Sequence, residues 1–194
     1  MAEITEVPPP GKRKSPLREL LETIILALVV ALVIRTFVVE VYRVDGSSME
    51  NTLHTEERVL VNKFLFRWGI REPEHGDIIV FQYPRQPDRD FIKRVVAVAG
   101  DTVELREGKV YVNGILFPEV PTVRMTDQDF PPRVVPEGAV WVLGDNRNNS
   151  EDSRYFGQVP LRNIRGLAFA RIWPLSRASG FTNPVTAAGV NLGR

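Results

Sequence analysis

Residues 102–117 read TVELREGKVYVNGILF, and this stretch decides the fold class. Apolar and polar side chains alternate on both sides of Glu107-Gly108, with apolar residues at Val103, Leu105, Val110 and Val112. A period of two is typical of half-buried strands, and Glu107-Gly108 is typical of a turn between them. Asn113-Gly114 then predicts a type I′ turn, which suits the twist of a tight hairpin. The stretch therefore predicts an antiparallel meander.

Five further stretches carry a β signal on either side of the meander. They are RVLVNKFLF (58–66), GDIIVFQY (76–83), FIKRVVAVAGD (91–101), AVWVLGD (139–145) and IRGLAFARIW (164–173). Together they predict a mainly antiparallel β domain over residues 41–175. Several prolines fall between residues 117 and 138, so we expect a small, loop-rich insertion at about 114–138. Residues 176–194 lack periodicity, and no structure is predicted for this C-terminal tail.

The N-terminal part contains the longest apolar run of the chain, ELLETIILALVVALVIRTFVVE (19–40). Between residues 24 and 39 only Arg35 and Thr36 are not apolar. As a helix the run spans about 30 Å, the thickness of a hydrocarbon core, so we expect a transmembrane anchor at 17–40. Two alternatives stay open from the sequence: a cleaved secretory signal and a buried core helix.

The arm before the anchor, residues 1–16, is rich in proline and is predicted to be disordered. Four basic residues precede the apolar run: Lys12, Arg13, Lys14 and Arg18. By the positive-inside rule they would keep the N-terminus in the cytoplasm. The β domain is then expected on the outer side of the cell membrane.

The composition excludes several kinds of chemistry. The formal net charge is +1, so nucleic acid is not an expected partner. The chain has no cysteine, which excludes disulfides and thiolate chemistry. Its two histidines, His54 and His75, are far apart in the sequence and serve a metal poorly. We therefore expect neither a metal nor a cofactor.

Residues 45–49, DGSSM, place two serines shortly after the apolar run. A serine hydroxyl is a weak nucleophile until a base removes its proton. The sequence around them fits neither the G-x-S-x-G elbow nor the S-x-x-K pattern, and both histidines are interpreted as surface residues in exposed turns. Lys93 is the other candidate base, because it lies in the apolar stretch 91–101, where burial would lower its pKa.

Four stretches, in this order along the chain, resemble the type I signal peptidases, the membrane-bound leader peptidases of bacteria and their organelles. They are VDGSSMENTL (44–53), GDIIVFQYP (76–84), FIKRVVAVAGD (91–101) and GDNRNNSEDSRYFGQVP (144–160). The resemblance covers most of residues 17–175 and leaves both tails outside. It implies a signal-peptidase-like, mainly β catalytic domain that is preceded by one transmembrane helix.

The resemblance also implies roles for individual residues. Ser48 would be the nucleophile, Lys93 the general base, and Ser150 the hydroxyl that orients the lysine amine. The backbone N–H of Ser48 would stabilise the oxyanion, and Gly46 stands where some members carry a second, hydroxyl donor. The loop would be held against the lysine strand by ion pairs, otherwise interpreted as surface salt bridges, of Asp145, Asp152, Arg94 and Arg154. Shallow pockets for small residues at −1 and −3 of the cleavage site would be lined by Tyr42, Val44, Val80 and Ile92.

The implied function is that of signal peptidase I, a membrane-bound serine endopeptidase that removes signal peptides from exported preproteins. Its partners would be those preproteins and the lipid bilayer. Ser48 follows Val39 by at most about 30 Å of extended chain, so its hydroxyl is expected near the membrane surface. Asn51 stands where the family usually has proline, which leaves the stiffness of the loop open. Two other functions stay open: an autoprotease of the SOS-repressor type, and a non-catalytic, membrane-tethered binding module.

Overall fold

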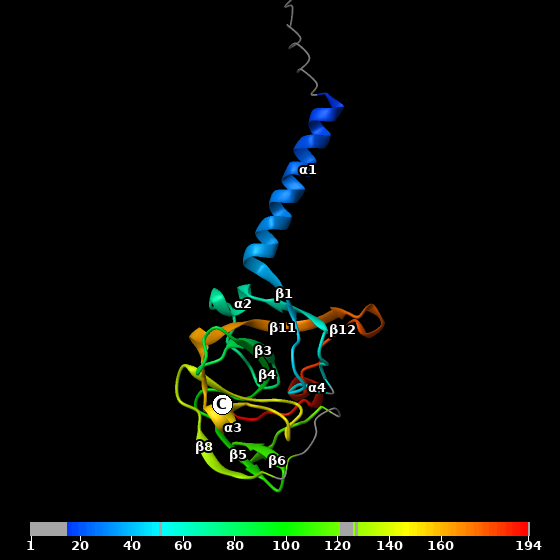
Figure 1. Cartoon of the computed structure of the whole chain (residues 1–194). Helices are drawn as coiled ribbons and strands as arrows, with labels where there is room; N and C mark the ends of the chain where they lie inside the picture. Colours follow the sequence, from blue (N-terminus) through cyan, green and yellow to red (C-terminus); the bar gives the residue numbers. More distant parts are fainter. Residues whose placement is uncertain (1–14, 51, 121–125, 127, 194) are drawn as a thin grey trace, which may run out of the picture.

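One long N-terminal helix projects from a β domain in the computed structural model (Figure 1). The structure describes residues 15–50, 52–120, 126 and 128–193. Helix α1 (Pro16–Val33) continues as a π-helix, η1 (Ile34–Val38). Ser15 caps α1 by accepting a hydrogen bond from the Arg18 N–H at 3.4 Å. Neither helix buries a side chain, so the alternative of a buried core helix is wrong.

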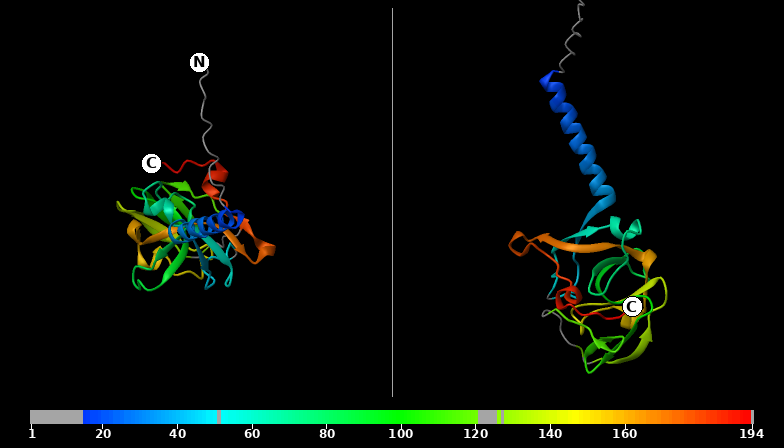
Figure 2. Two further views of the ribbon diagram at one scale, coloured as in Figure 1. Left: turned by 90° about the horizontal axis from the view of Figure 1, so that it is seen from above. Right: turned by 180° about the vertical axis from the view of Figure 1, so that it is seen from behind.

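The segment Pro16–Val38 is long and apolar enough to cross a membrane. It points away from the β domain in Figure 1 and in the view from behind (Figure 2). Lys63 ties its lower end to the sheet, because its N–H donates to the Val38 carbonyl and its Nζ to the Thr36 carbonyl, both at 2.9 Å. The predicted basic arm 1–16 lies outside the described residues, apart from its last two.

The larger sheet carries the loops that form the site. Its order is β1-β2-β11-β3-β4-β9-β10, with β12 paired to β11, and the paired strands run antiparallel. The bounds are β1 (Val39–Arg43), β2 (Arg58–Asn62), β3 (Ile78–Gln82), β4 (Asp90–Ala97), β9 (Ala139–Leu143), β10 (Val159–Pro160), β11 (Ile164–Trp173) and β12 (Ser179–Gly180). This topology confirms the prediction of a mainly antiparallel β fold behind one apolar helix.

Two short helices and one 3-10 turn interrupt the path between these strands: α2 (Phe64–Arg67), α3 (Ser153–Phe156) and η2 (Leu161–Asn163). The stretch 58–66, expected as one strand, becomes helical after Asn62. The Asn62 side chain accepts hydrogen bonds from the N–H groups of Phe64 and Leu65, at 2.9 and 3.2 Å. These bonds favour a helical turn over a continued ladder, since a short amide side chain competes with strand pairing.

The smaller sheet, with the order β7-β6-β5-β8, contains the predicted meander. Its bounds are β5 (Thr102–Arg106), β6 (Lys109–Val112), β7 (Ile115–Leu116) and β8 (Phe130–Val134). Both turns use positive φ angles, as a type I′ turn requires, at Glu107 (53°), Gly108 (70°), Asn113 (53°) and Gly114 (77°). The Pro-rich segment was expected to be rich in loops, yet it contributes β8. Because β8 pairs only at the edge of the sheet, its prolines break no inner ladder.

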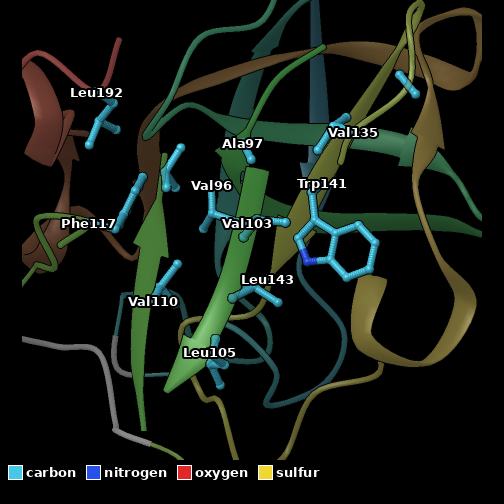
Figure 3. Close-up of a cluster of buried hydrophobic side chains, with 12 residues drawn as sticks. Val96, Ala97, Val103, Leu105, Val110, Phe117, Val135, Trp141, Leu143 and Leu192 are labelled. Carbon is cyan, nitrogen blue, oxygen red and sulfur yellow. The ribbon is translucent and has the colours of Figure 1, made fainter. Parts of the chain in front are cut away.

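One apolar core joins the two sheets (Figure 3). The larger sheet supplies buried side chains from β4 and β9, among them Val96, Ala97, Trp141 and Leu143, and the smaller sheet supplies the four apolar residues of the meander. Leu192 from the C-terminal tail lies in the same cluster and is only 3% exposed. The tail also forms η3 (Leu175–Arg177) and α4 (Pro184–Ala188), so it is a structured part of the fold.

Candidate active site

Ser48 in the β1–β2 loop lies against Lys93 of β4. Lys93 Nζ donates hydrogen bonds to Ser48 Oγ at 2.6 Å and to the Ile92 carbonyl at 3.1 Å. Gly46, two residues before the serine, has a φ of +99°, a conformation that glycine adopts without strain. Among the described residues no group accepts a hydrogen bond from the Ser48 backbone N–H. That N–H is therefore available to a ligand.

Burial controls the charge of Lys93, which is 4% exposed. Its Nζ lies 5.0 Å from the centre of the Phe91 ring, and Tyr83 stacks on that ring with 4.4 Å between centroids. Desolvation lowers the pKa of Lys93 to about 8, although it is opposed by the carboxylates of Asp152, Glu151 and Asp145. The amine is therefore half neutral near pH 8. A neutral amine 2.6 Å from a hydroxyl can accept its proton.

Ser150 lies near the Ser48 carbonyl but makes no hydrogen bond to Lys93. Its Oγ is buried and has no hydrogen-bond partner among the described residues. Gly144 explains how closely the segments pack: a Cβ at this position would meet Ser150 Oγ at 2.2 Å and the Ser48 carbonyl oxygen at 2.5 Å. A glycine is thus required where the two serine-bearing segments approach each other.

The four charged residues expected to support the site form two buried ion pairs. Arg94 donates to both oxygens of Asp145, at 2.9 Å from Nε and 2.7 Å from Nη2, and the side chains are 1% and 0% exposed. This pair joins β4 to the loop after β9. Arg154 pairs with Asp152 at 2.8 Å within the loop itself, so it does not reach the lysine strand. Their burial rules out the interpretation as surface salt bridges.

A groove of about 680 Å³ runs past the serine and the lysine. All four residues expected to form substrate pockets line it, namely Tyr42, Val44, Val80 and Ile92. Burial is the main cause that raises the pKa of the Tyr42 hydroxyl, and Glu40 and Asp90 add to it. The groove therefore combines apolar side chains with a neutral phenol.

Sequence reasoning missed two asparagines that fix the serine loop. The Asn146 N–H donates to the Ser48 carbonyl at 3.0 Å, and its side-chain amide donates to the Ser47 carbonyl at 3.1 Å. The side-chain amide of Asn149 donates to Ser47 Oγ at 2.8 Å. Both asparagines lie in the string GDNRNNS, so the motif contains them, but the sequence does not show that they bond to the serine loop. Thr52 was also missed, and its hydroxyl donates to Asp145 at 2.6 Å.

Neither histidine is among the described residues that line the groove. His54 lies outside it, in the turn before β2. His75 was expected in an exposed turn, but its side chain is 14% exposed and its Nε2 lies 2.6 Å from an Asp101 oxygen. The expectation was wrong for His75, because a buried carboxylate holds the ring. Asn51, the departure from the family pattern, lies outside the described residues.

Comparisons with known proteins identify the family. The family model described as signal peptidase, peptidase S26, matches residues 17–173, including the apolar helix. The chain is 38% identical to a probable signal peptidase I-2 of Synechocystis over 90% of this chain and 81% of that protein. It is 41% identical to a signal peptidase I of Leptolyngbya laminosa over 86% and 84%, respectively.

A crystal structure of a signal peptidase I from Enterococcus faecalis is also similar. It has a TM-score of 0.44 and 36% identity, and the match covers 50% of this chain and 97% of that one. The family match and the two relatives favour a peptidase over the autoprotease and the binding module. The chain therefore belongs to the signal peptidase family, peptidase S26, and is a serine endopeptidase.

Proposed function

We propose that Ser48 and Lys93 form the catalytic dyad of this peptidase and that it removes signal peptides from exported preproteins after small residues. The observation that carries the proposal is the 2.6 Å contact between Lys93 Nζ and Ser48 Oγ at a lysine whose pKa is lowered to about 8. A Ser-Lys pair is an established alternative to the serine–histidine arrangement.

In the proposed acylation, neutral Lys93 takes the hydroxyl proton of Ser48 as Oγ bonds to the peptide carbonyl carbon. The negative oxygen that forms lies within reach of the Ser48 N–H, which is unpartnered among the described residues. The lysine ammonium then gives its proton to the leaving amine, the C–N bond breaks, and an ester on Ser48 remains. Water attacks this ester while Lys93 takes a water proton, and that proton returns to Oγ as the acid leaves.

Ser150 is proposed to orient the lysine amine once substrate is bound. The Ser150 Oγ is buried and unpartnered among the described residues, and both it and the Ser48 carbonyl pack against Gly144, which supports this role. Apo hydrogen bonds in active sites are often incomplete and tighten in the complex. Arg94 and Asp145 are proposed to hold the loop against β4, whereas Asp152 and Arg154 stiffen the loop.

The proposed specificity comes from the apolar part of the groove. Val44 and Val80 are 4% and 2% exposed, and their short side chains line the groove together with Ser48 and Lys93. Tyr42 and Ile92, both half-buried, complete the lining. Small side chains at −1 and −3 fit this space, and a large one would have to displace buried valines.

The enzyme is anchored in a membrane, and we propose that this is the cell membrane, with the N-terminus cytoplasmic and the β domain outside. The basic residues before α1 support the orientation. Large apolar side chains support contact with lipid: Trp68 just after α2 is 63% exposed, Trp173 at the end of β11 is 51% exposed, and Leu175 in η3 is 75% exposed. In Figure 1, α2 lies beside the lower end of α1.

The test is cleavage of a preprotein with an Ala-x-Ala site by the detergent-solubilised enzyme. Ser48→Ala and Lys93→Ala should each abolish cleavage without unfolding the protein. Ser176→Ala and Lys109→Ala, an exposed serine of η3 and an exposed lysine on β6, are the matched controls and should cleave like wild type. Normal cleavage by Lys93→Ala would mean that another group is the base.

A further inference from the structure

Arg147 is a fully buried cation in the loop of residues 144–154, which we call the 144–154 loop. Its side chain is 0% exposed. Its Nε donates to the Gly144 carbonyl at 3.0 Å, and its Nη2 donates to both carboxylate oxygens of Glu119, at 2.7 and 2.8 Å. Among the described residues, Glu119 is the ion-pair partner of Arg147. A buried guanidinium depends strongly on such a partner, since it has lost its water.

Glu119 belongs to the Pro-rich segment, outside the four stretches that define the site in sequence. It follows β7 of the smaller sheet, and its side chain is 20% exposed. With it, each guanidinium group around the 144–154 loop has a carboxylate partner: Arg94 pairs with Asp145, Arg154 with Asp152 and Arg147 with Glu119. Without Glu119, the buried Arg147 would lose its ion-pair partner among the described residues.

Arg147 is linked to Ser48 through the residue before it in the sequence, Asn146. Asn146, its direct neighbour, donates from its N–H to the Ser48 carbonyl at 3.0 Å and from its side chain to the Ser47 carbonyl at 3.1 Å. The Arg154 guanidinium also donates to the Arg147 carbonyl at 2.5 Å, so the backbone on the other side is held as well. A shift of Arg147 would therefore move the hydrogen bonds that fix Ser48.

We propose that Glu119 is a positioning residue of the peptidase: through Arg147 it holds the 144–154 loop, and thereby Ser48, in the reactive geometry. Through this ion pair, the start of the Pro-rich segment connects the smaller sheet to the active site. The inference rests on the proposed function for its kinetic readout, but the ion pair can also be tested without substrate. Small displacements of reacting groups cost large factors in rate, whereas the groove that binds substrate shares no residue with this pair.

The experiment uses the full-length enzyme with both charges removed together, Glu119→Leu with Arg147→Met. Replacing a buried ion pair by apolar residues is often neutral for stability, so this variant should fold, whereas a single change would leave an unpaired buried charge. The matched control is Glu104→Leu with Arg106→Met, which removes a longer pair of the same smaller sheet, 3.8 Å apart, whose arginine is 58% exposed. Thermal unfolding checks that both variants are folded at the assay temperature.

Preprotein cleavage by the Glu119/Arg147 variant should show a kcat about tenfold lower or more, with KM within about twofold of wild type. The control pair should match wild type. Hydrogen–deuterium exchange without substrate should be faster in peptides covering 44–53 and 144–154 and unchanged in β2. A folded variant with wild-type kcat, or with a raised KM alone, would overturn the proposal. If wild type itself cleaves no preprotein, the proposed function fails. Independently of that result, unchanged hydrogen–deuterium exchange in the variant would show that the Glu119–Arg147 pair does not hold the 144–154 loop.

Discussion

Replacing Lys93 with methionine should make the folded protein more stable at pH 7 while abolishing cleavage. Methionine has a similar length and no charge. Burial moves the pKa of Lys93 from 10.5 to about 8, and each pH unit corresponds to about 1.4 kcal/mol, so keeping the ammonium in the fold costs about 3 kcal/mol at pH 7. Loss of the two hydrogen bonds to Ser48 and to the Ile92 carbonyl would offset about 2 kcal/mol of this, about 1 kcal/mol each. We expect a net gain of about 1 kcal/mol in the free energy of unfolding.

The gain should depend on pH in one direction. In the unfolded chain the lysine keeps its proton up to its ordinary pKa of 10.5, whereas in the folded protein it loses the proton near pH 8. Between these values the unfolded state binds more protons, so the stability of wild type rises with pH. The advantage of Lys93→Met is therefore full below about pH 8 and shrinks as the pH rises toward 10.5.

Urea unfolding in detergent, followed by tryptophan fluorescence at pH 7 and again near pH 9.5, measures both effects. Lys109→Met on β6 is the control, because that residue is exposed and should change stability little at either pH. A Lys93→Met protein that is less stable than wild type at pH 7 would show that the amine is not held at a desolvation cost. The same conclusion would follow from a gain of equal size at both pH values.

Three further outcomes follow from the site. The kcat/KM of wild type should fall about tenfold per pH unit below about pH 8. Glu151→Gln should shift this decline to lower pH, because one carboxylate that raises the pKa of Lys93 is lost. A kcat/KM that stays constant down to pH 6 would exclude Lys93 as the base. Gly144→Ala should reduce kcat by about 100-fold, because the added Cβ meets Ser150 and Ser48. The control Gly180→Ala, whose Cβ has its nearest neighbour 3.8 Å away, should keep a kcat near that of wild type. Equal activities of the two variants would contradict the close packing of Ser150 and Ser48 around Gly144. Trp68→Ser with Trp173→Ser should slow cleavage of a preprotein in vesicles severalfold but leave hydrolysis of a short soluble peptide unchanged, with Tyr155→Ser on α3, 51% exposed, as the control. An equal loss on both substrates would place these tryptophans in the catalytic machinery instead.

The elements that the sequence predicts well are those whose signal is local. Alternation and the Glu107-Gly108 and Asn113-Gly114 turns depend on neighbours a few residues away, so the meander is confirmed strand by strand. The end of β2 shows the limit of this reasoning. The apolar run continues after Asn62, but a side-chain amide captures two N–H groups and turns the chain into α2.

The candidate site divides in a similar way. The resemblance supplied Ser48 and Lys93, and the structure places them in contact. It did not supply Glu119, since nothing in the sequence distinguishes this acid from the others of a Pro-rich segment until the fold brings it to Arg147. The same holds for Leu192, an apolar residue in a tail without periodicity that becomes buried only through contacts distant in sequence.

Helix η1 passes directly into β1, and Lys63 is hydrogen-bonded to the Thr36 and Val38 carbonyls. Because no flexible linker separates the apolar helix from the sheet, the length of β1 and of the loop after it sets the distance between Ser48 and a bilayer that holds the helix. In the proposed function, a scissile bond must lie at that height to be cut by Ser48. Signal peptides would then be selected by how far their cleavage site protrudes from the lipid as well as by the side chains beside it.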